Sequence, residues 1–146
     1  MKASSLGVAL FVAVAVGCSG DSTGVASSSE FVGDWLASSY VVTNIANTSQ
    51  SEDLTALGMT LSITFTETTY SGTASFPGEV TEVFSGTYTI EGNQLTLNET
   101  GKLETDTMTY ALVGDTMTLS GLDEQHDFDD DGVEDPASFV MVLQRQ

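Results

Sequence analysis

From Phe31 onward, apolar and polar residues alternate along the chain with a period of two. The segment MTLSITFT, residues 59–66, places methionine, leucine, isoleucine and phenylalanine on one face and serine or threonine on the other. This period is typical of strands that are buried on one face only. Extended along the chain, the pattern predicts eight strands, near residues 34–43, 59–66, 69–75, 80–90, 94–99, 104–113, 116–121 and 137–144.

Two segments of the chain repeat one pattern and predict two hairpins. TYTIEGNQLTL (87–97) and TYALVGDTMTL (109–119) share the order T-Y-x-x-x-G-x-x-[L/M]-T-L. Gly92-Asn93 and Gly114-Asp115 suit two-residue turns with glycine in the first central position. With these turns every cross-strand pair on one face is apolar, and a slip of one residue would destroy that agreement. The predicted pairs are Tyr88–Leu97, Ile90–Leu95, Tyr110–Leu119 and Leu112–Met117.

Consecutive short strands with one apolar face indicate an all-β fold. Closing an antiparallel meander of about eight strands into an up-and-down barrel removes the exposed strand edges. A two-sheet β-sandwich is the alternative. Longer connections interrupt the meander at 44–58 and at 122–136. In the first, SQSEDLTALG predicts a single helical turn with Ser51 as its N-cap.

The first residues, MKASSLGVALFVAVAVGC, have the order of an export signal. Lys2 supplies a positive charge, and Leu6 to Val16 form an uncharged, mostly apolar run. A helix of this length spans about half of a bilayer core, which is typical of a signal peptide rather than a transmembrane helix. The sequence therefore predicts a signal peptide at 1–17, an attachment cysteine and Gly/Ser tether at 18–30, and a folded domain at 31–146.

AVGC, at residues 15–18, resembles the lipobox of bacterial lipoproteins. In that motif a small residue precedes a cysteine that is lipidated and becomes the new N-terminus; Ala15 stands where leucine is usual. Cys18 is the single cysteine of the chain. The resemblance implies a lipid on Cys18, and Ser19 implies sorting to the outer membrane, with the domain in the periplasm or on the cell surface. An ordinary secretory signal that is cut nearby is the alternative.

Composition and charge narrow the function. Apolar residues make up 40% of the chain, so a core can form, and the net charge is −18 with only three Lys and Arg residues. No basic patch can neutralise phosphates, which excludes nucleic-acid binding. The same charge disfavours adsorption to anionic lipid, so a membrane contact would go through Cys18. His126, the single histidine, lies in an acidic stretch, and no catalytic motif accompanies it. We expect no enzyme.

FVGDW, residues 31–35, opens the first predicted strand. A Gly-x-Trp at the start of an eight-stranded meander resembles the lipocalin signature, and the nearest likeness is to small bacterial lipocalin-like lipoprotein domains. In that family the Trp closes the narrow end of the barrel and an Arg from beyond the last strand packs across it. The resemblance implies that Gly33, Trp35 and Arg145 close the barrel, with a cation–π contact between the last two. It also implies that 44–58 is a lid over the open end.

The resemblance leaves two functions open. The first is a lipid-anchored binding module that holds a small apolar or amphipathic molecule inside the barrel. The second is a structural or interaction domain whose interior is filled by its own side chains. The side chains expected to fill the interior in that case are Phe84, Tyr88, Tyr110, Met117, Phe139 and Met141.

DFDDDGVED, at residues 127–135, concentrates carboxylates at the spacing of an oxygen-ligand calcium loop. In such a loop, ligands come from alternate positions and a glycine at the sixth position makes the sharp turn, which here is Gly132. The flanking strands and Ser138 at the twelfth position differ from a complete EF-hand. The spacing predicts a weak, structural Ca²⁺ site, and a solvated acidic turn is the alternative. The predicted ligands are Asp127, Asp129, Asp131, the Val133 carbonyl and Asp135.

Overall fold

The computed structural model describes residues 27–146, apart from the side chain of Asp123. The predicted signal peptide, 1–17, and Cys18 lie outside these residues. Within them, no helix is long and apolar enough to cross a membrane. The elements are α1 (Ser28–Phe31), β1 (Gly33–Asn44), β2 (Ser51–Asp53), β3 (Thr60–Phe65), β4 (Thr69–Ser75), β5 (Glu82–Glu91), β6 (Gln94–Glu99), β7 (Asp106–Val113), β8 (Thr116–His126) and β9 (Asp135–Arg145).

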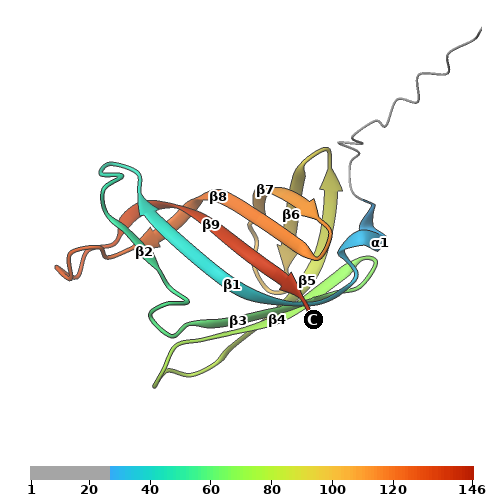
Figure 1. Ribbon diagram of the computed structural model, residues 1–146, viewed down its shortest axis with the longest axis horizontal. Coiled ribbons are helices and arrows are strands. Elements are labelled where there is room, and N and C mark those ends of the chain that lie inside the picture. The colour runs from blue at the N-terminus through green and yellow to red at the C-terminus, as the bar shows by residue number, and fades with distance from the viewer. Residues whose placement is uncertain (1–26) are drawn as a thin grey trace, which may run out of the picture.

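The strands form one closed antiparallel barrel (Figure 1). From β3 to β9, each strand pairs with the next along the chain, β1 pairs with β3, and β1 also pairs with β9 from Trp35↔Arg145 to Asn44↔Ala137. The barrel therefore has eight strands, β1 and β3 to β9, and β2 lies beside β1 as an additional short strand. This confirms the predicted up-and-down barrel, and the β-sandwich alternative is wrong.

The two repeated hairpins have the predicted register. Tyr88 faces Leu97 and Ile90 faces Leu95 in the first, and Tyr110 faces Leu119 and Leu112 faces Met117 in the second. Gly92 and Gly114 have φ angles of 62° and 58°, a region that glycine enters without steric cost. Turn chemistry and the apolar face thus specify the same pairing.

The connection between β1 and β3 differs from the prediction. Ser51 is not a helix N-cap but the first residue of β2, where it pairs with Thr43. A single turn follows at 54–58, and Asp53 caps it by accepting hydrogen bonds from the Thr55 N–H and hydroxyl. The C-terminal half of β1 extends beyond its pairing with the shorter β3. There β2 pairs with β1, so backbone N–H and C=O groups of β1 that would otherwise lack a partner form hydrogen bonds.

The β8–β9 hairpin is longer than predicted, which shortens the acidic connection to 127–134. A β-bulge between Gly121 and Glu124 interrupts the alternation, because Gly121 pairs with Phe139 and Glu124 with Ala137. The strand then continues as far as His126, which faces Asp135. Beyond a bulge the side chains change face, so the period of two no longer identifies the rest of the strand.

A short helix, α1, precedes the barrel in a segment that we predicted to be part of the tether. In α1, Ser27 and Glu30 form a capping box, in which the Ser27 N–H donates to Glu30 Oε2 at 2.6 Å. These residues belong to the predicted tether, and they bring Phe31, which is fully buried, against the barrel. Figure 1 shows α1 and the C-terminus at one end of the barrel and the 45–50 and 127–134 loops at the other. We call these the closed end and the open end.

Candidate functional site

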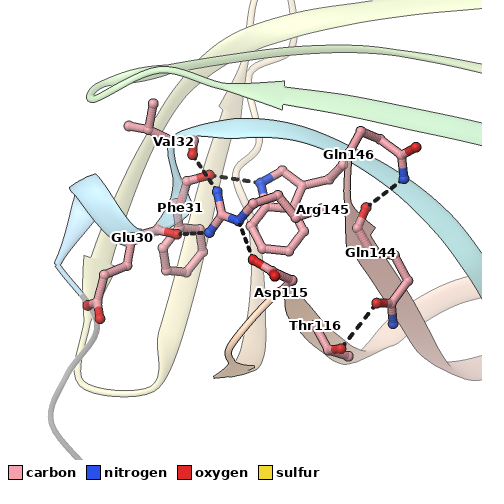
Figure 2. Close-up of polar contacts among 9 residues, drawn as sticks. Glu30, Phe31, Val32, Asp115, Thr116, Gln144, Arg145 and Gln146 are labelled. Carbon is pink, nitrogen blue, oxygen red and sulfur yellow. Dashed lines mark hydrogen bonds and ion pairs between the residues drawn. The ribbon is translucent and has the colours of Figure 1, made fainter.

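Arg145 and Trp35 are in contact at the closed end, and Figure 2 shows the polar contacts of Arg145 there. The Arg145 guanidinium lies 4.3 Å from the centre of the Trp35 ring, and its Nη atoms each donate at 2.6 Å to a backbone carbonyl, those of Val32 and Glu30. Trp35 Nε1 donates to the Phe31 carbonyl at 2.8 Å. The guanidinium therefore satisfies carbonyls at the end of α1 while it stacks on the indole.

Gly33 makes this arrangement possible. Its φ angle is 141°, and a Cβ atom at this position would lie 2.8 Å from Arg145 Nη1. The glycine of the Gly-x-Trp pair is thus required both by its backbone conformation and by the space that Arg145 occupies. The structure brings together the three predicted barrel-closing residues, Gly33, Trp35 and Arg145.

Aromatic rings fill the closed half of the barrel. The Phe31 ring packs with its centre 5.8 Å from that of Phe65, 6.0 Å from Tyr88 and 4.9 Å from Tyr110. The hydroxyl of Tyr88 donates to the Thr66 carbonyl at 2.7 Å, so this buried ring has its polar atom satisfied. The buried rings at this end therefore pack against one another.

The open half of the barrel contains a cavity of about 240 Å³. Its lining includes exposed residues, Asp106, Thr107 and Leu122, so the cavity opens to solvent. Of the six side chains predicted to fill the barrel, Tyr88, Tyr110 and Met117 lie in the filled half. The other three, Phe84, Phe139 and Met141, line the cavity. The apolar and aromatic lining is Tyr40, Leu61, Ile63, Tyr70, Phe84, Leu97, Met108, Leu119, Leu122, Phe139 and Met141.

Two glycines make room for aromatic rings of the cavity wall. A Cβ atom at Gly121 would lie 2.5 Å from the Phe139 ring, and one at Gly72 would lie 2.5 Å from the Phe84 ring. Such distances are impossible without displacement of the ring or the strand. Gly72 in β4 lies next to the strand of Phe84, and Gly121 in β8 lies next to the strand of Phe139. The cavity therefore depends on these two small residues as much as on the large ones that line it.

Carboxylates stand at the mouth of the cavity. Glu99, Asp106 and Glu124 all belong to its lining, at the open ends of β6, β7 and β8. The Tyr40 hydroxyl donates to Glu124 Oε1 at 2.5 Å. Burial, this hydrogen bond and the nearby charge raise the pKa of Tyr40 well above its usual value. Burial, with the charges of Glu99 and Asp106, raises the pKa of Tyr70 to about 12.

Lys102 lies beside these carboxylates. Its Nζ is 2.7 Å from Glu99 Oε2, and the side chain is 59% exposed on the loop between β6 and β7. The hydrogen bond to Glu99 raises the pKa of the Lys102 ammonium, and the charges of Glu99, Asp106 and Glu82 raise it further. The mouth of the cavity therefore has a negative potential that holds one ammonium of the chain itself.

A family model described as "Lipocalin-like domain" matches residues 31–130, from Phe31 through β1 to β8. The chain belongs to the lipocalin-like domain family. This confirms the resemblance that the Gly-x-Trp motif indicated, and members of the family are usually non-catalytic binding proteins. Neither a curated protein nor a solved structure gives a significant match to the chain.

The acidic loop of this lipocalin-like domain brings three carboxylates together. Asp127, Asp129 and Asp131 each offer an oxygen within 4.8 Å of the others, so an exposed triad that can hold a metal is present. Asp127 accepts hydrogen bonds from the N–H groups of Gly132, at 2.8 Å, and of Asp131, at 3.2 Å. Gly132 has a φ angle of 83°, in agreement with the sharp turn predicted there.

Two carboxyl groups of the triad have pKa values shifted in opposite directions. The Gly132 N–H and further backbone N–H groups lower the pKa of Asp127, whereas the charge of Asp131 raises the pKa of Asp129. Of the two remaining predicted ligand residues, Val133 donates its N–H to Asp131 Oδ1 at 2.8 Å, and Asp135 begins β9 opposite His126, from where its charge contributes to the raised pKa of Asp129. The structure thus groups three of the five predicted ligand residues.

His126 lies half-buried beside the acidic loop. Its Nε2 is 3.0 Å from Glu52 Oε2, and its ring packs edge-on against Phe128 with centres 4.7 Å apart. Glu52 belongs to β2, so this contact joins the additional strand to the end of β8. These two contacts place His126 in a structural contact between two strands.

Proposed function

We propose that this lipocalin-like domain is a non-enzymatic binding module, anchored in the bacterial envelope by lipid, that holds a small amphipathic molecule in the open half of its barrel. The observation that carries the proposal is the division of the interior into a filled end and a cavity of about 240 Å³ with an apolar, aromatic wall. A dry cavity of about 150 Å³ accepts benzene, so a ligand of one ring or a short chain fits here.

A pair of adjacent substitutions on β9 tests the cavity. Met141 lines the cavity and is 7% exposed, whereas Val140 points outward and is 46% exposed. Met141→Trp should fill the cavity and abolish binding of a fluorescent apolar dye, while Val140→Trp should leave it unchanged. Mass spectrometry of an organic extract of the purified protein should show a molecule in the parent that Met141→Trp lacks. A parent that binds no dye and releases no molecule would favour the structural role instead.

The anchor is proposed from the sequence and fits the position of α1. The described chain enters the barrel through α1 at the closed end, and the mouth of the cavity lies at the other end. Acyl chains contribute about 0.8 kcal/mol for each buried CH₂, so two or more chains hold stably. In cells, the parent should take up labelled fatty acid and fractionate with the outer membrane. Cys18→Ser should do neither, and labelling of that variant would contradict the assignment.

We further propose that Ca²⁺ binds the Asp127, Asp129 and Asp131 carboxylates and holds the end of the β8–β9 hairpin. The support is their separation and the repulsion that raises the pKa of Asp129, which a cation would relieve. A site of this kind has a Kd on the order of 10⁻⁴–10⁻³ M. Millimolar Ca²⁺ should therefore raise the melting midpoint of the parent relative to EDTA, and Asp129→Asn/Asp131→Asn should not respond. An equal midpoint of the parent in both conditions would identify a solvated acidic turn.

A further inference from the structure

The cavity combines an apolar interior with charges of one sign at its mouth. Among the described residues that line it, every charged side chain is a carboxylate: Glu99, Asp106 and Glu124. They come from three neighbouring strands, so they share one side of the opening. A ligand whose tail enters the barrel would therefore bring its head group against these carboxylates.

Glu124 is directed to the cavity by the β-bulge. Gly121 faces the interior against the Phe139 ring, and uninterrupted alternation would next turn residues 123 and 125 inward. The extra residue between Gly121 and Glu124 shifts this order, and Glu124 instead meets the buried Tyr40 hydroxyl inside the barrel. A carboxylate that faces aromatic rings loses favourable contacts with water, and an ion pair with a cationic ligand would compensate for that loss.

The aromatic wall also favours a cation. Tyr40 and Phe139 pack edge to face with ring centres 5.8 Å apart, and Tyr70 and Phe84 lie 6.2 Å apart. All four rings line the cavity. The faces of aromatic rings carry partial negative charge and attract an ammonium group within about 6 Å. The aromatic rings and the carboxylates therefore both favour a positively charged ligand.

Lys102 shows that an ammonium is held at this mouth. It contacts Glu99 at 2.7 Å from an exposed loop beside the cavity lining, and among the described residues it is the one basic side chain near these three carboxylates. One ammonium leaves an excess of negative charge, which repels a carboxylate or phosphate head group and attracts a second cation.

We propose that the cavity selects a cationic amphiphile, a small molecule with a ring or short apolar chain and a protonated primary amine that pairs with Glu124 and the neighbouring carboxylates. The inference rests on the proposed function and specifies the chemical class of its ligand. It distinguishes this domain from a carrier of fatty acids, whose head group would be repelled.

Three probes with one apolar body and different head groups test this selectivity. We choose 3-phenylpropylamine, 3-phenyl-1-propanol and 3-phenylpropionate, titrated at pH 7 and low ionic strength by calorimetry or dye displacement. The amine should bind about tenfold more tightly than the alcohol, and the propionate should bind weakest. Added NaCl should reduce the advantage of the amine, because screening weakens partly exposed charge pairs.

Charge-neutralising variants locate the selectivity. Glu124→Gln should weaken amine binding about tenfold and alcohol binding much less, because only the ammonium forms an ion pair with the carboxylate. Glu91→Gln is the matched control, since it removes the same charge from the end of β5 beside the Gly92 turn, away from the cavity lining. Lys102→Gln should tighten amine binding. If Glu124→Gln fails to fold, Asp106→Asn, at the exposed rim of the cavity, tests whether the carboxylates at the mouth select the amine.

The outcomes separate the two proposals. If the alcohol and the propionate bind as tightly as the amine, or if Glu91→Gln weakens the amine as much as Glu124→Gln does, the cation selectivity is overturned and the binding cavity remains. If none of the three probes binds and the apolar dye is not bound either, the proposed function fails together with its ligand class.

Discussion

Arg145 joins three parts of the chain at the closed end. It stacks on Trp35, donates to two carbonyls beside α1, and pairs with Asp115 through Nε at 3.1 Å. A lysine keeps the charge but has neither the planar stacking surface nor the fork of donors. Arg145→Lys should therefore lower the free energy of unfolding by about 1–3 kcal/mol.

Urea denaturation of the two proteins measures this loss. Lys102→Gln is the control, because it removes a cation whose exposed pair contributes at most about 1 kcal/mol. Equal stability of Arg145→Lys and the parent would show that charge alone, rather than stacking and carbonyl capping, holds the closed end.

Asp53 accepts four hydrogen bonds where β2 ends. Its carboxylate receives the Thr55 hydroxyl at 2.6 Å, the N–H groups of Thr55 and Tyr40 at 3.0 and 3.2 Å, and the Ser39 hydroxyl at 3.1 Å. The Thr55 hydroxyl, followed by the other donors, lowers the pKa of Asp53 from 3.8 to about 2. The fold thus favours the charged form of this carboxyl.

Because the folded pKa lies below the unfolded one, the stabilisation from Asp53 is complete above about pH 4 and is lost as the pH falls toward 2. Asp53→Ala should lower the free energy of unfolding by about 1–2 kcal/mol at pH 7. The difference from the parent should shrink between pH 4 and pH 2. Melts across that range measure it, with Ser51→Ala on the same strand as control. A difference that is constant down to pH 2 would refute the role of the charge.

At the scale of elements, α1 covers the closed end of the barrel. Its Phe31 is fully buried among Phe65, Tyr88 and Tyr110, and its carbonyl accepts the Trp35 indole N–H. Phe31→Ala should therefore destabilise the domain by about 3–5 kcal/mol. Val32→Ala, one residue further and 38% exposed, should cost far less. Denaturation of both variants measures the contrast, and similar losses would show that α1 does not seal the barrel.

The same elements show which parts of the fold the sequence could predict. Strands with a sustained period of two were predictable, and so was the hairpin register, because apolar pairing and glycine turns agree on it. β2 is three residues long with no alternation, and the bulge before Glu124 hides the end of β8. α1 had a visible signal, the S-x-x-E of Ser27 and Glu30, within a serine-rich stretch that is typical of a tether.

The site was less predictable than the fold. Gly33, Trp35 and Arg145 could be named because a motif marks two of them and the third is the single arginine. The cavity depends on which rings fill the barrel, and that follows from the position of Phe31 and from Gly72 and Gly121 beside other rings. Glu124 faces inward only because of the bulge. Such three-dimensional relations leave no periodic trace in the sequence.

At the scale of the whole molecule, charge is unbalanced. The chain has 21 acidic and three basic side chains, and its net charge is −18. The lysine and the arginine of the described residues form two ion pairs, Lys102–Glu99 and Arg145–Asp115, so salt has few attractions to weaken. Repulsion among the remaining carboxylates is greater in the compact state than in the unfolded chain.

NaCl should therefore stabilise the protein. Raising it from about 10 mM to 0.5 M shortens the Debye length from about 30 Å to less than 5 Å. The melting midpoint at pH 7 should rise by a few degrees, equivalent to about 1 kcal/mol. In Asp129→Asn/Asp131→Asn the rise should persist, because it arises from the whole surface, whereas the response to millimolar Ca²⁺ should disappear. A midpoint that falls with NaCl would instead show that the few attractive pairs at the two ends of the barrel outweigh the repulsion of the whole surface.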